Sequence, residues 1–190
     1  SWKAGIAGPV KHAAIFDGEV YDAREMPDSA LFAQFAAPEI NTEFNGEILP
    51  TNGAEIYLRT DLALNPVKAY TWEGIRDSSE EAYGTVIIKK EFQLGDTLAV
   101  HPGETLVVDF GQNCAAVPSF VFNAKEGTRL TCVVSELLND GNGAISRGMD
   151  GPEGSVHRLN LRIPETGMTL DYTFAASETP VSYYPHHTFY

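Results

Sequence analysis

Acidic side chains gather first between residues 17 and 24, where Asp17, Glu19 and Asp22 lie close together in the sequence and Arg24 follows them. Acids at this spacing can surround a hard cation such as calcium, which prefers several oxygen ligands. Asp17 is the residue assigned to such a calcium ion. The alternative is a turn in which Asp17 accepts hydrogen bonds from local backbone amides while Asp22 and Arg24 form an ion pair. The residue types alone favour the turn.

A second polar group follows a valine-rich stretch, where Asp109, Gln112 and Asn113 flank Gly111. Carboxylate and amide groups offer many hydrogen-bond donors and acceptors. They suit the hydroxyls of a sugar, and they serve equally well to hold the backbone of a loop. From the residue types, a structural corner is favoured over a ligand site.

Other kinds of reaction centre find no support in the sequence. Neither cysteine has surroundings that would lower its pKa, and no G-x-S-x-G elbow is present for a serine nucleophile. The glycine-rich stretch near Gly141 lacks the lysine of a phosphate-binding loop, and the histidines lack zinc-site spacing. A glycosidase needs two carboxylates facing each other across a sugar, and abundance alone identifies no such pair.

The elements that must position these residues are mostly strands. The chain has 190 residues with 17 glycines, 11 prolines and 11% aromatic residues, a composition typical of short strands joined by turns. Alternation of apolar and polar side chains predicts about ten strands. They cover residues 10–16, 55–59, 67–72, 85–92, 105–110, 118–122, 128–135, 156–163, 168–174 and 183–190. One short helix is expected over 29–37, capped by Asp28 or Ser29 and stopped by Pro38.

Glycine and proline turns between these segments favour an all-β fold, an antiparallel β-sandwich or jelly roll. We expect residues 1–190 to form a single domain, because no linker, repeat or low-complexity tract interrupts the chain. Residues 139–155 are rich in glycine and lack apolar periodicity, which predicts a long surface loop.

Charge and hydropathy limit the expected partners. Acidic residues outnumber basic ones by 26 to 13, and Lys and Arg do not cluster, so nucleic acid is not expected. The apolar runs are too short to cross a bilayer and no signal peptide is evident, so no membrane partner is expected. Cys114 and Cys132 lie in apolar stretches and are expected to be buried free thiols. They leave the compartment open, with a periplasmic or extracellular location favoured over the cytoplasm.

Several of these segments are similar to one known family. Gly18–Arg24 reads GEVYDAR and resembles the GExYDAR signature of the bacterial α-L-rhamnosidases, and Asp109–Asn113 matches the DFGQN signature of the same enzymes. The GT, EL and DG pairs between residues 127 and 141 fit the pattern that follows it. Residues 185–190 resemble a later family strand, cut off before its last four residues. Residues 26–90 match poorly, because an alanine-rich segment and an apparent insertion replace the usual sequence.

The resemblance implies a galactose-binding-like β-sandwich that precedes the helical (α/α) barrel of an α-L-rhamnosidase, which hydrolyses terminal α-L-rhamnosyl residues. In that family the general acid and base lie in the barrel, so no catalytic residue is expected in this chain. Some members carry a related jelly roll that binds L-rhamnose through calcium. The implied partners are a rhamnose-containing carbohydrate and the catalytic barrel of the same chain.

Three functions are therefore weighed for the domain. The first is carbohydrate binding, with Trp72 stacking on a pyranose unless it is buried in the core. Its candidate sugar-binding residues are Glu19, Asp22, Arg24, Trp72, Asp109, Gln112, Asn113 and Glu136. The second is a purely structural domain that packs on the barrel and has no sugar site. A third, in which Glu19, Asp22 and Glu136 act as catalytic acids, is disfavoured.

Overall fold

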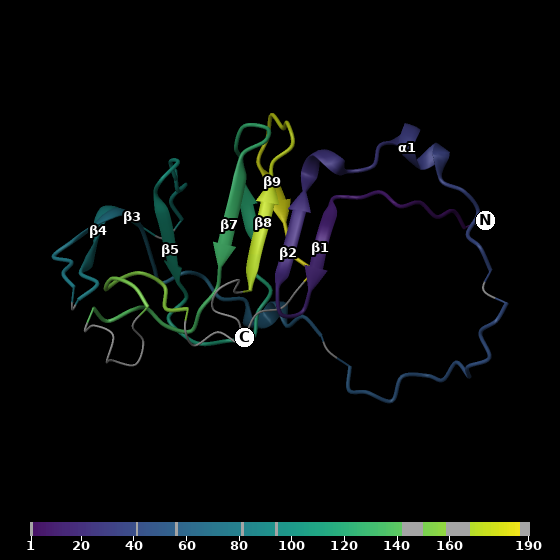
Figure 1. Cartoon of the computed structure of the whole chain (residues 1–190), viewed down its shortest axis with the longest axis horizontal. Coiled ribbons are helices and arrows are strands. Elements are labelled where there is room, and N and C mark those ends of the chain that lie inside the picture. The colour runs from purple at the N-terminus through teal and green to yellow at the C-terminus, as the bar shows by residue number, and fades with distance from the viewer. Residues whose placement is uncertain are drawn as a thin grey trace.

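The regular elements of the described chain are almost all strands. The structure is a computed structural model that describes residues 2–40, 42–55, 57–80, 82–93, 95–141, 150–158 and 168–186. Its strands in these ranges are β1 (Val10–Ala14), β2 (Gly18–Asp22), β3 (Lys68–Arg76), β4 (Thr85–Phe92), β5 (Thr105–Asp109), β6 (Phe120–Phe122), β7 (Arg129–Val133), β8 (Thr169–Thr173) and β9 (Val181–Tyr183). The short helices are η1 (Ala23–Glu25), α1 (Ser29–Gln34) and η2 (Thr60–Leu62). The all-β prediction is confirmed (Figure 1).

Three sheets are formed by the described strands. The largest has the order β1-β2-β8-β7, the second β4-β3-β5 and the third β6-β9. Neighbouring strands run antiparallel with one exception, because β2 and β8 are parallel and pair Gly18 with Thr169 and Asp22 with Thr173. Figure 1 shows the four-stranded sheet at the centre of the molecule and the β4-β3-β5 sheet to its left.

Strand β2 coincides with the GEVYD part of the first motif, for which the sequence predicted no strand. Its pairing with β8 aligns Glu19 with Leu170 and Tyr21 with Tyr172. Side chains paired across neighbouring strands lie on the same face, so Glu19 shares a face with these apolar residues. An acid at an inward position breaks the apolar alternation, which explains why the pattern did not reveal this strand.

The inner face of the large sheet carries an aromatic core. Tyr172, Phe174 and Tyr183 are buried, and Tyr21 and Phe122 pack against them. The rings of Tyr21 and Tyr172 stack with centroids 5.3 Å apart, and those of Phe122 and Tyr172 are 4.7 Å apart. Because Phe122 and Tyr183 belong to the β6-β9 sheet, the two sheets form the layers of a β-sandwich.

A second core lies on the β4-β3-β5 sheet. It consists of buried Tyr70, Val86 and Val107, with Trp72 packed against them. The Tyr70 hydroxyl donates a hydrogen bond to the carbonyl oxygen of Gly154 at 2.7 Å, which ties the segment before β8 to this sheet.

The ends of the predicted loop over 139–155 are anchored in the fold. Asn139 is buried, and its side-chain amide donates to Ser155 Oγ at 2.9 Å and to the Val156 carbonyl at 3.2 Å. The Asn139 side-chain oxygen accepts from the backbone amide of Asp150 at 3.1 Å. The surface-loop prediction therefore fails at both ends, since buried polar groups hold them, while residues 142–149 lie outside the described residues.

Helix α1 is shorter than expected and begins where the sequence predicted. The Asp28 side chain accepts a hydrogen bond from the backbone amide of Leu31 at 2.8 Å, as an N-cap does. Beyond the helix, the chain from residue 42 to 55 extends away from the sheets (Figure 1), and the described residues from 36 to 65 are all exposed.

Three predicted strands differ from the structure. Residues 55 and 57–59 form no strand, because they lie in this exposed segment and pair with no other strand. Val156 makes only an isolated bridge to Leu138, and residues 159–163 lie outside the described residues. The last strand ends at Tyr183 instead of beginning there, and residues 187–190 lie outside the described part. Among the described helices, none is long and apolar enough to span a membrane.

Candidate functional site

The site begins with Glu19, a carboxylate on the apolar face of β2. Glu19 is only 1% exposed. Tyr183 donates its hydroxyl to Glu19 Oε1. Glu19 Oε2 accepts the backbone amide of His186 at 2.9 Å and lies 2.7 Å from His186 Nδ1. A buried carboxylate is tolerated only when such partners surround it, so these contacts account for its position in the core.

The same contacts keep Tyr183 as a neutral donor. Burial raises the pKa of the Tyr183 phenol, and its hydrogen bond to the Glu19 carboxylate raises that pKa further. Glu19 thereby connects β2 to β9 and to the residues just after it. The arrangement joins the GEVYDAR segment to the C-terminal segment from inside the protein.

Asp22 and Arg24 form the second part of the site, at the end of β2. Asp22 is the N-cap of η1, and its Oδ1 accepts from the Arg24 backbone amide at 3.1 Å. The Arg24 guanidinium donates to both Asp22 oxygens, at 2.9 and 2.7 Å. Hydrogen bonds from the Arg24 side chain lower the pKa of Asp22 from 3.8 to about 2. Asp22 and Arg24 thus form the local ion pair that the sequence offered as the alternative to a calcium site.

The lowered pKa predicts a loss of stability in acid. A carboxylate with a depressed folded pKa stabilises the fold above its unfolded value and loses that contribution as pH falls through the folded value. The native chain should therefore lose stability between pH 3.8 and about 2 as Asp22 is protonated. The Asp22→Asn variant should show a flatter pH dependence in this window, measured by urea unfolding. Arg24→Gln should flatten it similarly, and an unchanged slope in both variants would contradict the assignment.

Asp17 lies in the turn between β1 and β2 and faces a histidine. Its Oδ2 is 3.4 Å from His12 Nε2, and its carbonyl oxygen accepts from the Thr169 amide at 3.3 Å. Within the described residues, no group of three or more His, Cys, Asp or Glu side chains is arranged to hold a metal ion. Asp17 therefore remains a candidate calcium ligand on sequence grounds alone.

The DFGQN segment forms a corner after β5. Asp109 Oδ1 accepts the backbone amide of Gly111 at 2.7 Å, and the Asp109 carbonyl accepts that of Val67 at the same distance. Gly111 has a φ of 74°, a left-handed conformation that favours glycine. Gln112 and Asn113 are exposed. Asp109 holds this corner, while the two amides face solvent.

Trp72 and Glu136 lie apart from these groups. Trp72 is half-buried against the Tyr70 core of the β4-β3-β5 sheet, and its indole Nε1 is buried without a hydrogen-bond partner. Glu136 is exposed beyond the end of β7. The structure brings Asp17, Glu19, Asp22 and Arg24 to one strand and its turn, but it places Trp72 and Asp109 on a different sheet.

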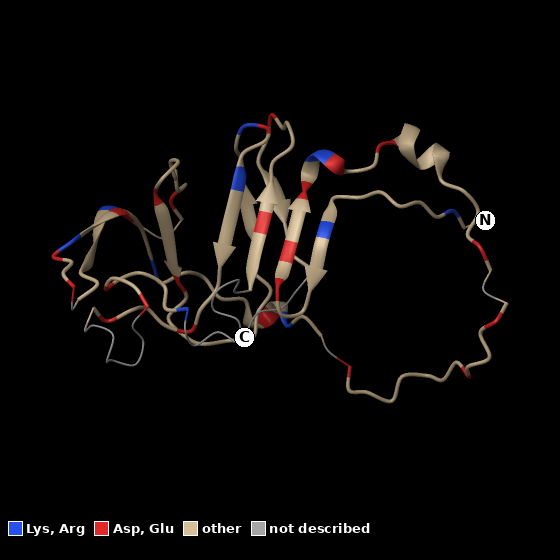
Figure 2. Cartoon of the chain, in the orientation of Figure 1, with Lys and Arg blue, Asp and Glu red and all other residues tan. Residues whose placement is uncertain are grey.

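Sequence reasoning missed the partners of these acids. Tyr183 and His186 were read only as parts of a strand pattern. Asp171 on β8 accepts hydrogen bonds from Thr131 and from Arg129, whose Nε lies 3.2 Å from Asp171 Oδ1. Burial raises the pKa of Asp171, but these hydrogen bonds outweigh it and leave the pKa below its ordinary value. Figure 2 shows the acidic positions of β2 and β8 on neighbouring strands.

The two cysteines are free thiols in the structure, and both are half-buried. Burial raises the pKa of the Cys132 thiol to about 11. A thiol with so high a pKa is a poor nucleophile at neutral pH. Cys132 therefore behaves as a packing residue of β7.

Comparison with known proteins gives the family context of this fold. Residues 99–190 match the family model described as the bacterial α-L-rhamnosidase concanavalin-like domain. This match confirms the resemblance to the bacterial α-L-rhamnosidases. The matched range includes the DFGQN corner and strands β5 to β9. A concanavalin-like domain is a β-sandwich, in agreement with the two packed sheets.

Two curated proteins named α-L-rhamnosidase are similar to the chain. The protein of Alteromonas sp. (strain LOR) is 24% identical over 145 residues, which cover 75% of this chain and 13% of the relative. The protein of Formosa agariphila is 24% identical over 191 aligned positions, which cover all of this chain and 16% of the relative. The rhamnosidase-like chain thus spans about a sixth or less of these proteins. No solved structure matches it significantly.

Proposed function

We propose that the 190 residues form one non-catalytic accessory domain of a longer α-L-rhamnosidase, and that the domain packs against the catalytic barrel of that enzyme. The relatives support a rhamnosidase context, since both bear that name and are several times longer than the chain. Terminal α-L-rhamnosyl groups of glycans or glycosides would be the substrate of the whole enzyme. The domain itself contributes packing surface in this proposal.

The exposed apolar residues between Ile40 and Leu64 carry this proposal. Ile40 and Ile48 are 85% and 88% exposed, and Phe44 and Leu49 are 61% and 68% exposed. Further along, Tyr57, Leu58 and Leu62 are more than half exposed. So many large apolar side chains in one segment indicate a surface that another part of a protein covers. We refer to these residues as the apolar segment.

The polar groups of the two motifs fit the same role. Glu19 is enclosed by Tyr183 and His186, Asp22 by Arg24, and Asp109 by its own corner. Groups that already have partners inside the domain gain little by bonding a sugar hydroxyl. The motifs therefore serve to maintain the fold that presents the apolar segment.

Hydrogen exchange of the apolar segment tests the packing role. Exchange of residues 42–55 should be slower in a longer rhamnosidase chain that includes the barrel than in the present chain. An Ile48→Ser/Leu49→Ser double variant should remove this protection, while it changes the unfolding free energy of the present chain by less than about 0.5 kcal/mol. Glu47→Ser in the same segment is the matched control. Equal exchange in the two chains would overturn the proposal.

Carbohydrate binding is a second candidate function, and the exposure of Gln112 and Asn113 favours it. Of the amides and acids considered for sugar contact, Asp109, Gln112, Asn113 and Glu136 are exposed, and Asp109 already accepts the Gly111 amide. Phe110, which is 39% exposed, lies beside them and offers an aromatic surface. A change in the chemical shifts of residues 111–113 during titration with L-rhamnose would support this role, and unchanged shifts would remove it.

A further inference from the structure

Two asparagine–glycine pairs lie in the exposed segment after α1. They are Asn45–Gly46 and Asn52–Gly53, and all four residues are exposed. Figure 1 shows residues 42–55 extended away from the sheets, and within the described chain none of them belongs to a helix or strand or takes part in a backbone–backbone hydrogen bond. Their backbone dihedrals are therefore not fixed by secondary structure. A third pair, Asn142–Gly143, lies outside the described residues.

An asparagine followed by glycine can react with its own backbone. The backbone nitrogen of the glycine attacks the asparagine side-chain carbon Cγ, a new N–Cγ bond forms, and the Cγ–Nδ2 bond breaks. Ammonia leaves with the proton of the glycine amide, and a cyclic succinimide remains. Water then opens the ring at either carbonyl and leaves an aspartate or an isoaspartate. Glycine permits the attack best, because it lacks the Cβ that restricts the backbone at the attacking nitrogen.

We propose that Asn45 and Asn52 are sites of spontaneous deamidation and that Asn45 is the faster of the two. The Gly53 amide donates a hydrogen bond to Thr51 Oγ1 at 3.3 Å, which directs its N–H away from Asn52 Cγ. No described group accepts a hydrogen bond from the Gly46 amide, so its nitrogen is ready to attack Asn45 Cγ. Water is the co-reactant, and no enzyme is needed.

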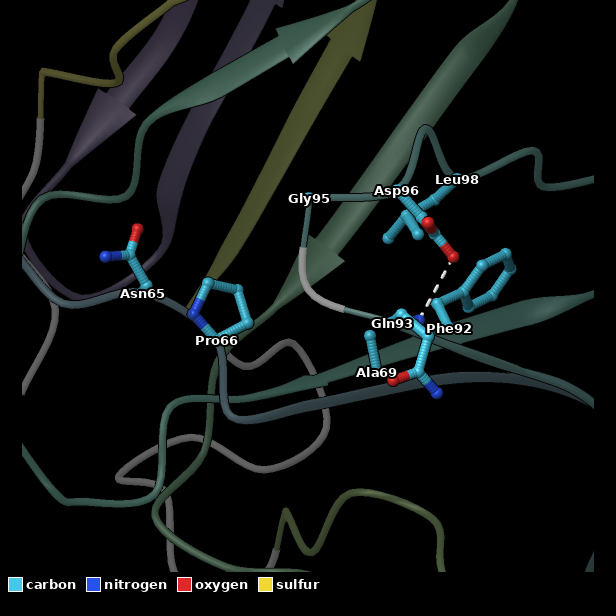
Figure 3. Close-up of a pocket in the computed structure, with 8 residues that line it drawn as sticks. All are labelled: Asn65, Pro66, Ala69, Phe92, Gln93, Gly95, Asp96 and Leu98. Carbon is cyan, nitrogen blue, oxygen red and sulfur yellow. Dashed lines mark hydrogen bonds between the residues drawn. The ribbon is translucent and has the colours of Figure 1, made fainter.

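Other exposed asparagines lack one of these conditions. Asn65 is followed by Pro66, whose nitrogen carries no hydrogen to release. Figure 3 shows these two residues side by side at the cavity that they line. Asn123 is exposed directly after β6, but Ala124 follows it, and the Cβ of alanine restricts the approach of the backbone nitrogen. Asn123 is therefore the internal control for the two proposed sites.

Deamidation would change the chemistry of the apolar segment. Each conversion adds one negative charge to a chain whose formal net charge is −13. The new carboxylate at residue 45 would lie next in sequence to Phe44 and close to Ile48, both of which are exposed. A charge on an apolar surface loses its hydration when another surface covers it. The modified segment should therefore pack less well on the catalytic barrel, a consequence that rests on the proposed packing role, whereas the reaction itself does not.

Incubation of the 190-residue chain at mildly alkaline pH, followed by peptide mapping with mass spectrometry, tests the two sites. Asn45 should undergo the amide-to-acid mass change about tenfold or more faster than Asn123, because its neighbouring nitrogen reaches Cγ more readily. Asn52 should react at an intermediate rate. Part of the product should be isoaspartate, which separates from the aspartate peptide by chromatography. Equal rates at Asn45 and Asn123, or a product without isoaspartate, would overturn the proposal.

Two variants test the role of each neighbour. Gly46→Ala should slow the reaction at Asn45 about tenfold or more and leave Asn52 unchanged. The added Cβ would meet only the end of the exposed Phe44 ring, which can turn aside, so this variant should fold normally. Thr51→Val removes the acceptor of the Gly53 amide and should raise the rate at Asn52 to that at Asn45. Unchanged rates in these variants would contradict the assignment, and none of these measurements depends on the barrel, so they are separate from the hydrogen-exchange test of packing.

Discussion

Replacing Glu19 with alanine is expected to lower the free energy of unfolding by about 3 kcal/mol, through lost hydrogen bonds and a cavity in the core. The carboxylate is buried and accepts from the Tyr183 hydroxyl and the His186 amide. The buried Tyr183 hydroxyl would be left without an acceptor, and the His186 amide would lose its acceptor. Urea unfolding followed by tryptophan fluorescence or circular dichroism measures the change.

A surface acid and a partner variant sharpen this test. Glu25 forms a 3.5 Å ion pair with Lys11 on the exposed surface, so Glu25→Ala should cost less than about 1 kcal/mol. Tyr183→Phe removes one donor and should cost an intermediate amount. If Glu19→Ala proves no more destabilising than Glu25→Ala, the buried network does not hold the two segments together.

Replacing Gly18 with alanine should also be strongly destabilising. Gly18 has a φ of 89°, and a Cβ built at this position would lie 1.9 Å from the carbonyl oxygen of Thr169 on β8. Because that neighbour is backbone, it can move only if the β2–β8 pairing shifts. A combined loss of about 3 kcal/mol is expected from the left-handed conformation and the overpacking.

Gly127 provides a matched control for this substitution. Its φ of 78° is similar, but nothing lies within 4 Å of a Cβ built there. Gly127→Ala should therefore show only the conformational cost of about 1–2 kcal/mol. Equal losses in the two variants, measured by urea unfolding, would show that the contact with Thr169 contributes nothing.

The elements with a complete local signal were predictable from the sequence. Alternation over residues 85–92 gave the bounds of β4 without error. Asp28 was expected as a cap and is one, since its side chain needs only a backbone amide three residues later. A helix cap and a single amphipathic strand depend only on the residue types at a few neighbouring positions, so the sequence pattern can predict them.

The partners of the buried acid could not be predicted, because they are distant in the sequence. Glu19 bonds to His186 across 167 positions, and no local pattern encodes such a contact. In the exposed segment after α1, the sequence predicted a strand that the structure does not have. Its alternation at residues 55–59 suggested a strand, yet a strand requires a neighbour for its backbone hydrogen bonds, and the described residues there pair with none.

The parallel pairing of β2 with β8 sets the order in which the domain can form during synthesis. Gly18 emerges from the ribosome about 150 residues before its partner Thr169, a delay of roughly 8–30 s at ordinary translation rates. Throughout that time the GEVYDAR segment has no β8 to pair with. Glu19 also lacks its hydrogen-bond donors, the Tyr183 hydroxyl and the His186 amide. The large sheet is therefore completed late, once the last fifth of the chain is available, and any premature release before that point leaves an unpaired strand edge open to other chains.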